Sequence, residues 1–309
     1  MDAFKLRNKV VADYSRYIKS FLKIRDQKIA KFVDTELANQ VLWPEPLLQL
    51  SPAYKPAQTV KQLAEAGILH PTCPEIFKTG NGSLLLHQHQ RTAIDVAAQG
   101  RNYVVTTGTG SGKSLTYILP IFDFILKNNP QEAKVRAIIV YPMNALINSQ
   151  EQALDRFVAN LPTGKEGCPV RYARYTGQES NERKKEIQQN PPHILLTNYV
   201  MLELMLTRPE ESGFVNATTS ALQFLVLDEL HTYRGRQGAD VAYLVRRLRE
   251  RCGNPALQCI GTSATMSAGS TRSERAREIA DVASRIFGSN VDSSDVIDET
   301  LRRILSSED

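Results

Sequence analysis

The chain has 309 residues, 42% of them hydrophobic, enough for one large core or for one core with an accessory domain. Four widely spaced cysteines without a Cys-x-x-Cys pair argue against a zinc site or a disulfide framework. The formal charge of +5 permits a polyanionic partner without requiring one. No apolar run approaches the ~20 residues of a membrane span, and the N-terminus lacks the apolar core of a secretory signal. We therefore expect a cytoplasmic protein with reduced thiols and no membrane partner.

The first 80 residues are expected to form an N-terminal extension. Residues 1 to about 38 predict one or two amphipathic helices, with Lys and Arg on the opposite face. We favour a packing arm with solvated charges, and direct nucleic-acid contact is the alternative. Prolines dominate residues 43–74, which predicts an extended connector around the short helix Val60–Ala66. The helical periodicity is carried by Val10, Tyr14, Ile18, Phe21, Ile29 and Phe32.

A phosphate-binding loop is predicted where the apolar pair Val104-Val105 meets a glycine-rich segment. The segment reads Thr107-Gly108-Thr109-Gly110-Ser111-Gly112-Lys113-Ser114 and precedes an apolar helix. Glycines let backbone N–H groups approach phosphate oxygens, and the helix N-terminus favours negative charge. Lys113 would reach the β- and γ-phosphates, while the Ser114 hydroxyl would coordinate Mg²⁺. Thr107 departs from the general pattern, which has glycine at that position.

The remainder of the chain alternates apolar strands with helices, which predicts an α/β fold with a parallel sheet covered on both faces. Functional loops should then cluster at the carboxyl ends of the strands. We expect strands at 104–105, 135–141, 170–175, 193–196, 224–227 and 259–261, and helices at 91–98, 115–126, 145–157, 180–189, 199–206, 271–287 and 297–305.

Two further groups have a use beside a nucleotide. Asp228-Glu229 follow the strand 224–227, so Asp228 can hold Mg²⁺ and Glu229 can orient or deprotonate an attacking water. An ordinary helix cap is the alternative for this pair. Gln90, about 20 residues before the phosphate loop, has an amide that could recognise an adenine edge. From spacing alone, an ordinary polar helix residue is the favoured interpretation of Gln90.

The ordered motifs of residues 84–266 resemble the first RecA-like motor lobe of superfamily 2 helicases of the DEAD/DEAH-box type. Thr107–Ser114 is similar to motif I, which in this superfamily often begins with a residue other than glycine. Asp228-Glu229-Leu230-His231 resembles motif II, and Ser263-Ala264-Thr265 resembles motif III. Gln90 matches the adenine-recognising Q motif. Tyr141–Leu146 resembles motif Ia, Thr176-Gly177 a glycine turn against nucleic acid, and Leu196–Tyr199 motif Ib.

The segment 228–235, Asp-Glu-Leu-His-Thr-Tyr-Arg-Gly, is similar to the large bacterial DNA helicases related to MrfA, some of which belong to phage-defence systems. The resemblance implies a RecA-like domain over 81–309 that uses ATP and Mg²⁺, with Lys113, Asp228 and Glu229 as catalytic residues. It further implies that His231, Ser263 and Thr265 couple the nucleotide state to the affinity for nucleic acid. The expected nucleic acid is DNA rather than RNA. Nucleic-acid contacts are expected from Pro142, Asn144, Thr176, Gly177, Thr197 and Asn198.

Such motors close ATP between two lobes, and the second lobe supplies arginine fingers. Only 44 residues follow Thr265, too few for another lobe, so we expect a fragment or one part of a larger motor. Its partners would be a second RecA-like lobe, in cis or in trans, and other defence proteins. We expect weak ATP hydrolysis from the isolated chain. Alternatives are a translocase on double-stranded DNA that does not separate strands, a non-catalytic scaffold module, and a nucleotide kinase, which would leave 263–265 unexplained.

Overall fold

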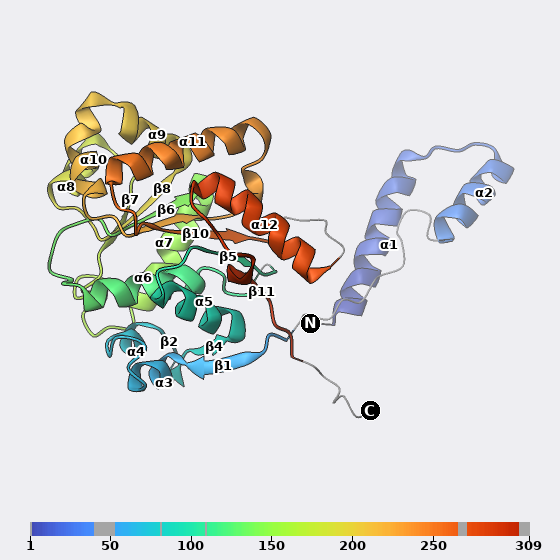
Figure 1. Ribbon diagram of the computed structural model, residues 1–309. Coiled ribbons are helices and arrows are strands. Elements are labelled where there is room, and N and C mark those ends of the chain that lie inside the picture. Colours follow the sequence, from blue (N-terminus) through green and yellow to red (C-terminus); the bar gives the residue numbers. More distant parts are fainter. Residues whose placement is uncertain (1, 40–52, 81, 109, 265–270, 303–309) are drawn as a thin grey trace. The chain divides into compact units, whose positions relative to one another are not determined.

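The computed structural model describes residues 2–39, 53–80, 82–108, 110–264 and 271–302 (Figure 1). The chain divides into two compact units, 1–52 and 53–309. The expected 1–80 extension is therefore shared between the units, because residues from 53 onward pack with the sheet. No helix in the described ranges has the length and apolar character needed to span a membrane.

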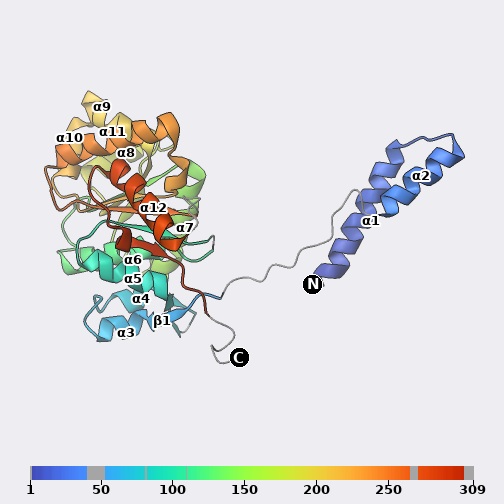
Figure 2. The ribbon, with the colours of Figure 1, turned by 45° about the vertical axis from the view of Figure 1, so that its right-hand side comes forward.

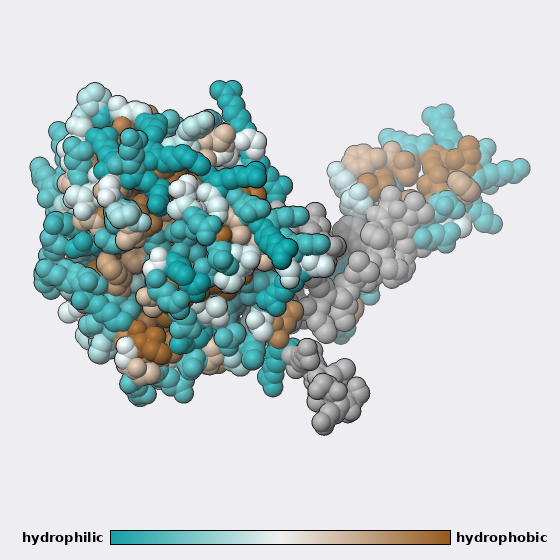
Figure 3. All heavy atoms as spheres, in the orientation of Figure 1, coloured by the Kyte–Doolittle hydropathy of each residue, from teal (hydrophilic) through white to brown (hydrophobic). Residues whose placement is uncertain are grey.

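The first unit contains two helices, α1 (Ala3–Phe21) and α2 (Gln27–Ala38). Asp2 and Asp26 cap them, each accepting hydrogen bonds from two backbone amides. An ion pair of 2.8 Å between Lys19 and Asp34 joins the helices. Hydrophobic residues gather on the surface of this unit, where Figure 3 shows them in brown. The large apolar side chains that remain exposed include Phe4, Leu6, Val10, Tyr17, Phe21, Leu22, Ile29 and Phe32.

The second unit is built on a seven-stranded parallel sheet with the order β11-β5-β10-β9-β6-β8-β7. Its central strands are buried apolar runs rich in β-branched residues, as expected for strands covered on both faces. The expected parallel α/β fold is confirmed. The strands are β5 (Tyr103–Thr106), β6 (Ala137–Tyr141), β7 (Tyr172–Arg174), β8 (Ile194–Asn198), β9 (Phe224–Leu227), β10 (Gln258–Ser263) and β11 (Val296–Asp298).

Helices cover the sheet in two layers, which lie on opposite sides in both ribbon views (Figures 1 and 2). One layer contains α3 (Val60–Glu65), α4 (Cys73–Ile76), α5 (Gln88–Ala98), α6 (Leu115–Lys127) and α7 (Asn144–Val158). The other contains α8 (Asn181–Gln189), α9 (Tyr199–Thr207), α10 (Ser212–Thr219), α11 (Gly235–Cys252) and α12 (Arg272–Phe287). Short 3₁₀ turns lie at Pro209–Glu211, Leu230–Thr232 and Ser293–Asp295.

Short strands complete the second unit. β1 (Pro56–Thr59) pairs antiparallel with β4 (Leu85–His87), and β2 (Lys78–Thr79) with β3 (Gly82–Ser83). The described part of the proline-rich stretch, from residue 53, is therefore more regular than the extended connector expected from sequence. A capping box at Thr59 and Gln62 begins α3 directly after β1.

The predicted helix 297–305 is wrong over its described residues. Val296–Asp298 form strand β11, which pairs with Val104–Thr106 of β5, and Leu301 bridges to Tyr54. A β-branched pair beside a buried parallel strand gains more from edge pairing than from a short helix. Residues 303–305 of that prediction lie outside the described range. The helices α10 and α11 were not expected.

Candidate nucleotide site and nucleic-acid interface

The predicted site residues lie at one edge of the sheet. All seven strands are parallel, so the loops after β5, β6, β8, β9 and β10 leave from the same edge. β10 lies between β5, which precedes the phosphate loop, and β9, which precedes the acidic pair. The topology therefore brings motifs I, II and III together on three adjacent strands.

The phosphate loop is closed by its own hydroxyl groups. Thr107 is buried, and its Oγ1 lies 2.5 Å from Oγ of Ser111. Thr107 at the position usually held by glycine thus braces the loop. Gly110 and Gly112 have φ values of +80° and +74°, a conformation that side chains other than glycine rarely adopt. Thr109 lies outside the described residues.

Gln90 is packed directly against this loop. Its Nε2 donates to the carbonyl oxygen of Gly112 at 3.0 Å, and its Oε1 accepts from the backbone amide of His87 at 2.8 Å. A Cβ on Gly112 would lie 2.5 Å from Gln90 Nε2, so this pair leaves no space for a side chain. His89 supports the same segment, with Nε2 3.0 Å from the carbonyl oxygen of Ser111. Adenine recognition by Gln90 stays a prediction, and its demonstrated contact is with the loop.

Lys113 connects the loop with the acidic pair. Its Nζ donates to the carbonyl oxygen of Thr107 at 3.2 Å and lies 4.0 Å from Oε1 of Glu229. Ser114, the following residue, makes no capping hydrogen bond to its own helix. Its hydroxyl is therefore not engaged in capping α6, as a cation ligand requires.

Asp228 is almost completely buried, with 7% of its surface exposed. Burial raises the pKa of this carboxyl group to about 6, against the lowering effect of a hydrogen bond from the Thr262 hydroxyl. The Glu229 charge raises this pKa further, and Lys113 lowers it. A buried carboxylate without a close cation is costly, so the site is suited to binding a positive charge.

Glu229 has a left-handed backbone, with φ at 54° and ψ at 52°. This conformation is uncommon for a residue with a side chain and costs roughly 1–2 kcal/mol. The Glu229 amide donates to Oγ1 of Thr262 at 3.2 Å, which helps to hold the turn. Oε2 of Glu229 lies 3.2 Å from Nδ1 of His231, and that nitrogen lies 3.3 Å from Oγ of Ser263. The structure thus brings together His231 and Ser263, whereas Thr265 lies outside the described residues.

Sequence reasoning missed Thr262 as a site residue. Its single hydroxyl contacts both the Asp228 carboxylate and the Glu229 amide. The available signal was a hydroxyl residue directly after the predicted strand 259–261 and before Ser263. The structure shows that Thr262 is fully buried on β10, next to the strand that carries the acidic pair.

A second omission is Glu299, which follows the edge strand β11. Its Oε2 accepts a hydrogen bond of 3.0 Å from the backbone amide of Gly108. Tyr54 lies beside it, and burial together with the Glu299 charge raises the pKa of the Tyr54 phenol. Backbone pairing of Lys55 with Thr300 and of Ala53 with Arg302 fixes this segment beside the loop. The Glu299 carboxylate therefore already accepts the hydrogen bond of a loop amide that a bound phosphate would use.

The residues predicted to contact nucleic acid lie at the ends of β6, β7 and β8. Asn198 Nδ2 donates to Asn144 Oδ1 at 2.7 Å, and Asn198 Oδ1 caps α9 by accepting from the Met201 amide. Met143, beside them, is 56% exposed. Pro142, before Met143, is partly exposed. This edge offers short polar groups and helix N-termini, which suit phosphate contacts.

Two of the predicted contact residues are turned inward. Thr197 is fully buried, and its hydroxyl donates to the carbonyl oxygen of Tyr175 at 2.6 Å. Thr176 is also buried, and its amide and hydroxyl both donate to one oxygen of Glu179, at 2.5 and 2.6 Å. Gly177 alone of this turn's predicted pair is exposed. Direct nucleic-acid contacts by these residues stay predictions.

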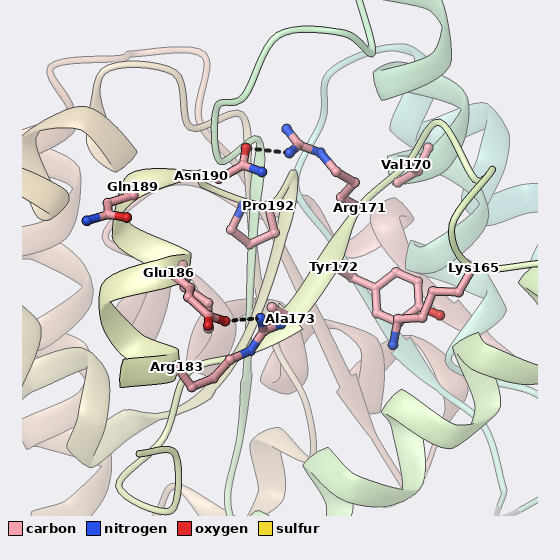
Figure 4. A pocket seen from close by; sticks show the side chains of 11 residues that line it. Lys165, Val170, Arg171, Tyr172, Ala173, Arg183, Glu186, Gln189, Asn190 and Pro192 are labelled. Atoms are coloured by element: carbon pink, nitrogen blue, oxygen red, sulfur yellow. Dashed lines mark hydrogen bonds and ion pairs between the residues drawn. The ribbon is translucent and has the colours of Figure 1, made fainter. Parts of the chain in front are cut away.

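A hollow of about 480 Å³ lies elsewhere, between edge strand β7 and helix α8 (Figure 4). Its cations are already engaged: Arg183 with Glu186 at 2.8 Å and Arg171 with Asn190 at 2.6 Å. β7 and β5 are five strand spacings apart in the sheet, or roughly 24 Å at ~4.8 Å per spacing. This hollow is therefore separate from the phosphate loop.

The donor set around the loop fits a metal-bound triphosphate. The described residues contain no cluster of three or more His, Cys, Asp or Glu side chains that could hold a metal ion. Mg²⁺ usually binds one or two protein oxygens together with substrate phosphates and water, and Asp228 and Ser114 can supply those oxygens. Glu229 Oε2 is buried and lies 3.2 Å from Nδ1 of His231, but it accepts no hydrogen bond among the described residues. The site thus has an acidic oxygen available to a bound ligand or water.

Comparisons with known proteins find relatives that include a Druantia protein and a helicase. The chain is 25% identical to the Druantia protein DruE of Escherichia coli (strain UMEA 4076-1), over 81% of this chain and 20% of that protein. It is 32% identical to the uncharacterized ATP-dependent helicase YprA of Bacillus subtilis (strain 168), over 59% of this chain and 23% of YprA. The chain thus spans about a fifth of the length of these relatives.

Solved structures give the same result. The crystal structure of the DUF1998 helicase MrfA bound to DNA and AMPPNP matches 83% of this chain and 33% of its own, with a TM-score of 0.62 and 25% identity. Helicase Lhr of Mycobacterium smegmatis, bound to ssDNA and AMP-PNP, matches 64% of this chain and 24% of its own, with a TM-score of 0.52 and 25% identity. These matches confirm the expected similarity to MrfA-type helicases. The DEAD/DEAH box helicase profile matches residues 87–273, which is more than half of this chain. The chain therefore belongs to the DEAD/DEAH box helicase family.

Proposed function

We propose that this chain is the ATP-binding lobe of a DNA helicase or translocase in which ATP hydrolysis drives movement along nucleic acid. The observation that carries the proposal is the meeting of Lys113 with the acidic pair, 4.0 Å from Nζ to Glu229 Oε1. A phosphate loop facing two carboxylates across three adjacent strands is the arrangement that hydrolysis of a metal-bound triphosphate requires.

In this mechanism Lys113 binds the β- and γ-phosphates, and the loop amides bind the remaining oxygens. Asp228 and Ser114 would hold Mg²⁺, and the bound ion would supply positive charge against the phosphates. Glu229 orients the attacking water and accepts its proton, while His231 limits the orientation of that carboxylate from 3.2 Å away. Gln90 fixes the loop through Gly112 and is proposed to read the adenine edge.

The proposal for DNA rests on the basic net charge and on the relatives. MrfA and Lhr have been solved with DNA, but Mss116, which shares the fold at 18% identity, has been solved with ssRNA. We therefore propose DNA as the preferred nucleic acid and a second RecA-like lobe, in cis or in trans, as the source of arginine fingers. Participation in phage defence stays a prediction from the resemblance.

The test measures binding of a fluorescent ATP analogue with and without Mg²⁺. Wild-type protein should bind the nucleotide, and Lys113→Ala should weaken binding by at least about tenfold because it removes a phosphate-contacting charge. The surface variant Lys134→Ala, at a residue paired with Glu132, is the control. Equal binding by Lys113→Ala and wild type would contradict the proposed site.

A helicase and a translocase on double-stranded DNA can be distinguished by the nucleic acid that stimulates ATP turnover. ATP turnover is measured with single-stranded DNA, double-stranded DNA and RNA, in the presence of a second lobe. Stimulation by single-stranded DNA and release of an annealed strand indicate a helicase. Stimulation by duplex alone, without strand release, indicates a translocase. Absence of turnover with intact nucleotide binding would favour the scaffold alternative.

A further inference from the structure

Two buried tyrosine hydroxyls lie between the nucleotide site and the nucleic-acid edge. Tyr117 lies on α6, three residues after Ser114, and Tyr141 is the last residue of β6. Both side chains are fully buried. Their hydroxyl oxygens are 3.5 Å apart, near the upper limit for a hydrogen bond. Neither hydroxyl has been assigned a role so far.

One end of this pair reaches the predicted metal site. Tyr117 lies one helical turn after Ser114, and its backbone amide donates to the Ser114 carbonyl oxygen at 3.3 Å. The Asp228 backbone amide donates to the carbonyl oxygen of Val140, the neighbour of Tyr141, at 2.9 Å. Burial and then the nearby Asp228 charge raise the pKa of both tyrosines, so the carboxylate lies within electrostatic range of both hydroxyls.

The other end reaches the nucleic-acid edge. Tyr141 is opposite Asn198 in the register of β6 and β8 and directly precedes Pro142. Two residues further, Asn144 receives the hydrogen bond of 2.7 Å from Asn198. Contacts therefore connect Ser114, through the two tyrosines, to the turn where nucleic acid is predicted to bind.

We propose that Tyr117 and Tyr141 are positioning residues that couple nucleotide binding at the phosphate loop to nucleic-acid binding at the Pro142–Asn144 turn. This inference rests on the proposed function. A buried hydroxyl requires a partner. A metal bound to the Ser114 hydroxyl would shift the first turn of α6, and with it the Tyr117 hydroxyl that lies 3.5 Å from Tyr141. The resulting shift at the end of β6 alters the turn that follows.

The experiment measures a coupling factor in the 309-residue chain. The affinity for a fluorescent single-stranded DNA is determined with and without saturating Mg²⁺-AMPPNP, and the affinity for the nucleotide with and without DNA. The two ratios must agree, because coupling is reciprocal. We expect a factor of about 5 or more in wild type, within the usual range for coupled sites. Tyr117→Phe and Tyr141→Phe should each bring it close to 1 while leaving each separate affinity within about threefold.

A purely structural role is distinguished by two further variants. Tyr172 lies on the distant edge strand β7, and its hydroxyl donates to Asp155 of α7 at 2.7 Å. Tyr172→Phe removes that hydroxyl. It should lower the melting temperature without changing the coupling factor. The double variant Tyr117→Phe/Tyr141→Phe removes both partners, so it should melt closer to wild type than either single variant. Its coupling should nevertheless remain near 1.

The outcomes separate the two levels of inference. Wild-type protein that binds neither ligand would contradict the proposed function itself. Wild-type protein that binds both ligands independently would overturn the coupling role and leave the proposed function standing. The same holds if the single tyrosine variants retain full coupling, or if Tyr172→Phe loses as much coupling as they do.

Discussion

The two halves of the functional edge use their polar residues differently. At the ends of β5, β9 and β10, Lys113 faces the acidic pair without a close ion pair, since its Nζ lies 4.0 Å from Glu229 Oε1. At the ends of β6, β7 and β8, short side chains are joined by close hydrogen bonds, such as 2.6 Å from Thr197 to the Tyr175 carbonyl oxygen. Charged side chains in the nucleotide half thus remain available to a ligand. The polar side chains in the nucleic-acid half already have hydrogen-bond partners within the protein.

This difference indicates what each motif contributes. In the nucleotide half the charged side chains are the proposed catalytic groups, so their charges must remain available to a ligand. In the nucleic-acid half the short polar side chains fix turns and caps, so we expect backbone amides and exposed groups to make the phosphate contacts. Substitutions should therefore affect catalysis in the first half and mainly stability in the second.

The largest expected effect comes from Glu229→Gln. This change keeps the shape of the side chain but removes a proton acceptor, so ATP turnover with a second lobe and DNA should fall by about 10²–10⁴-fold. Nucleotide affinity should stay within a few-fold of wild type. Glu132→Gln, at a carboxylate paired with Lys134 and Arg136, is the matched control. Unchanged turnover in Glu229→Gln would show that another group activates the water.

The second prediction concerns the cost of keeping Asp228 charged. Its pKa is about 6 in the folded protein, above the ordinary value of 3.8. The folded state thus binds the proton more strongly, so stability falls as pH rises from about 4 to 6 and stays reduced at pH 7. At about 1.4 kcal/mol per pKa unit, Asp228→Asn should stabilise the protein at pH 7 by up to roughly 3 kcal/mol.

Thermal melting across pH provides the measurement. The melting temperature of Asp228→Asn should exceed that of wild type by several degrees at pH 7, and the difference should vanish near pH 4. Mg²⁺-dependent nucleotide binding should be lost at the same time. A variant that melts below wild type at pH 7 would show that the carboxylate stabilises the site rather than straining it.

The same contrast explains how much the sequence could predict. The phosphate loop and the Asp228-Glu229 pair follow short-range rules, with apolar strands next to residues of distinctive chemistry, and the structure places them directly after β5 and β9. Strand β11 depends on a distant partner, since Val296–Asp298 pair with β5 about 190 residues earlier. The local strand propensity of residues 296–298 does not indicate which distant strand they pair with.

The roles of Thr262 and Glu299 were hidden for the same reason. Each acts through a contact between residues far apart in the chain, 33 positions for the Glu229 amide with Thr262 and 191 for Gly108 with Glu299. Helix α11 is a different case, because Val241, Leu244, Val245 and Leu248 have helical spacing and Gly253 ends the helix with a left-handed conformation. Its signal was present in the sequence and was overlooked.

The third prediction compares two buried threonines directly. Thr262→Val and Thr197→Val each remove a buried hydroxyl of similar volume and should each cost about 1–3 kcal/mol of unfolding free energy. Only Thr262→Val should also weaken Mg²⁺-nucleotide binding, by roughly tenfold, since it withdraws the hydrogen bond that lowers the pKa of Asp228. Denaturant unfolding and nucleotide titration provide the two measurements. Equal effects of Thr262→Val and Thr197→Val on nucleotide binding would contradict the proposed difference between the nucleotide half and the nucleic-acid half.

The smallest expected effect concerns Glu299, the carboxylate that accepts a hydrogen bond from the Gly108 amide of the phosphate loop. Glu299→Gln can still accept the hydrogen bond from the Gly108 amide but no longer repels a triphosphate. We expect nucleotide affinity to rise about three- to tenfold at low salt, and the gain to shrink at high salt as the charges are screened. Asp298→Asn, at the neighbouring carboxylate paired with Arg272 at 3.4 Å, should have a smaller effect. Weaker binding by Glu299→Gln would instead mean that Glu299 contacts the bound nucleotide, so the sign of the change decides whether this carboxylate competes with the ligand or helps to hold it.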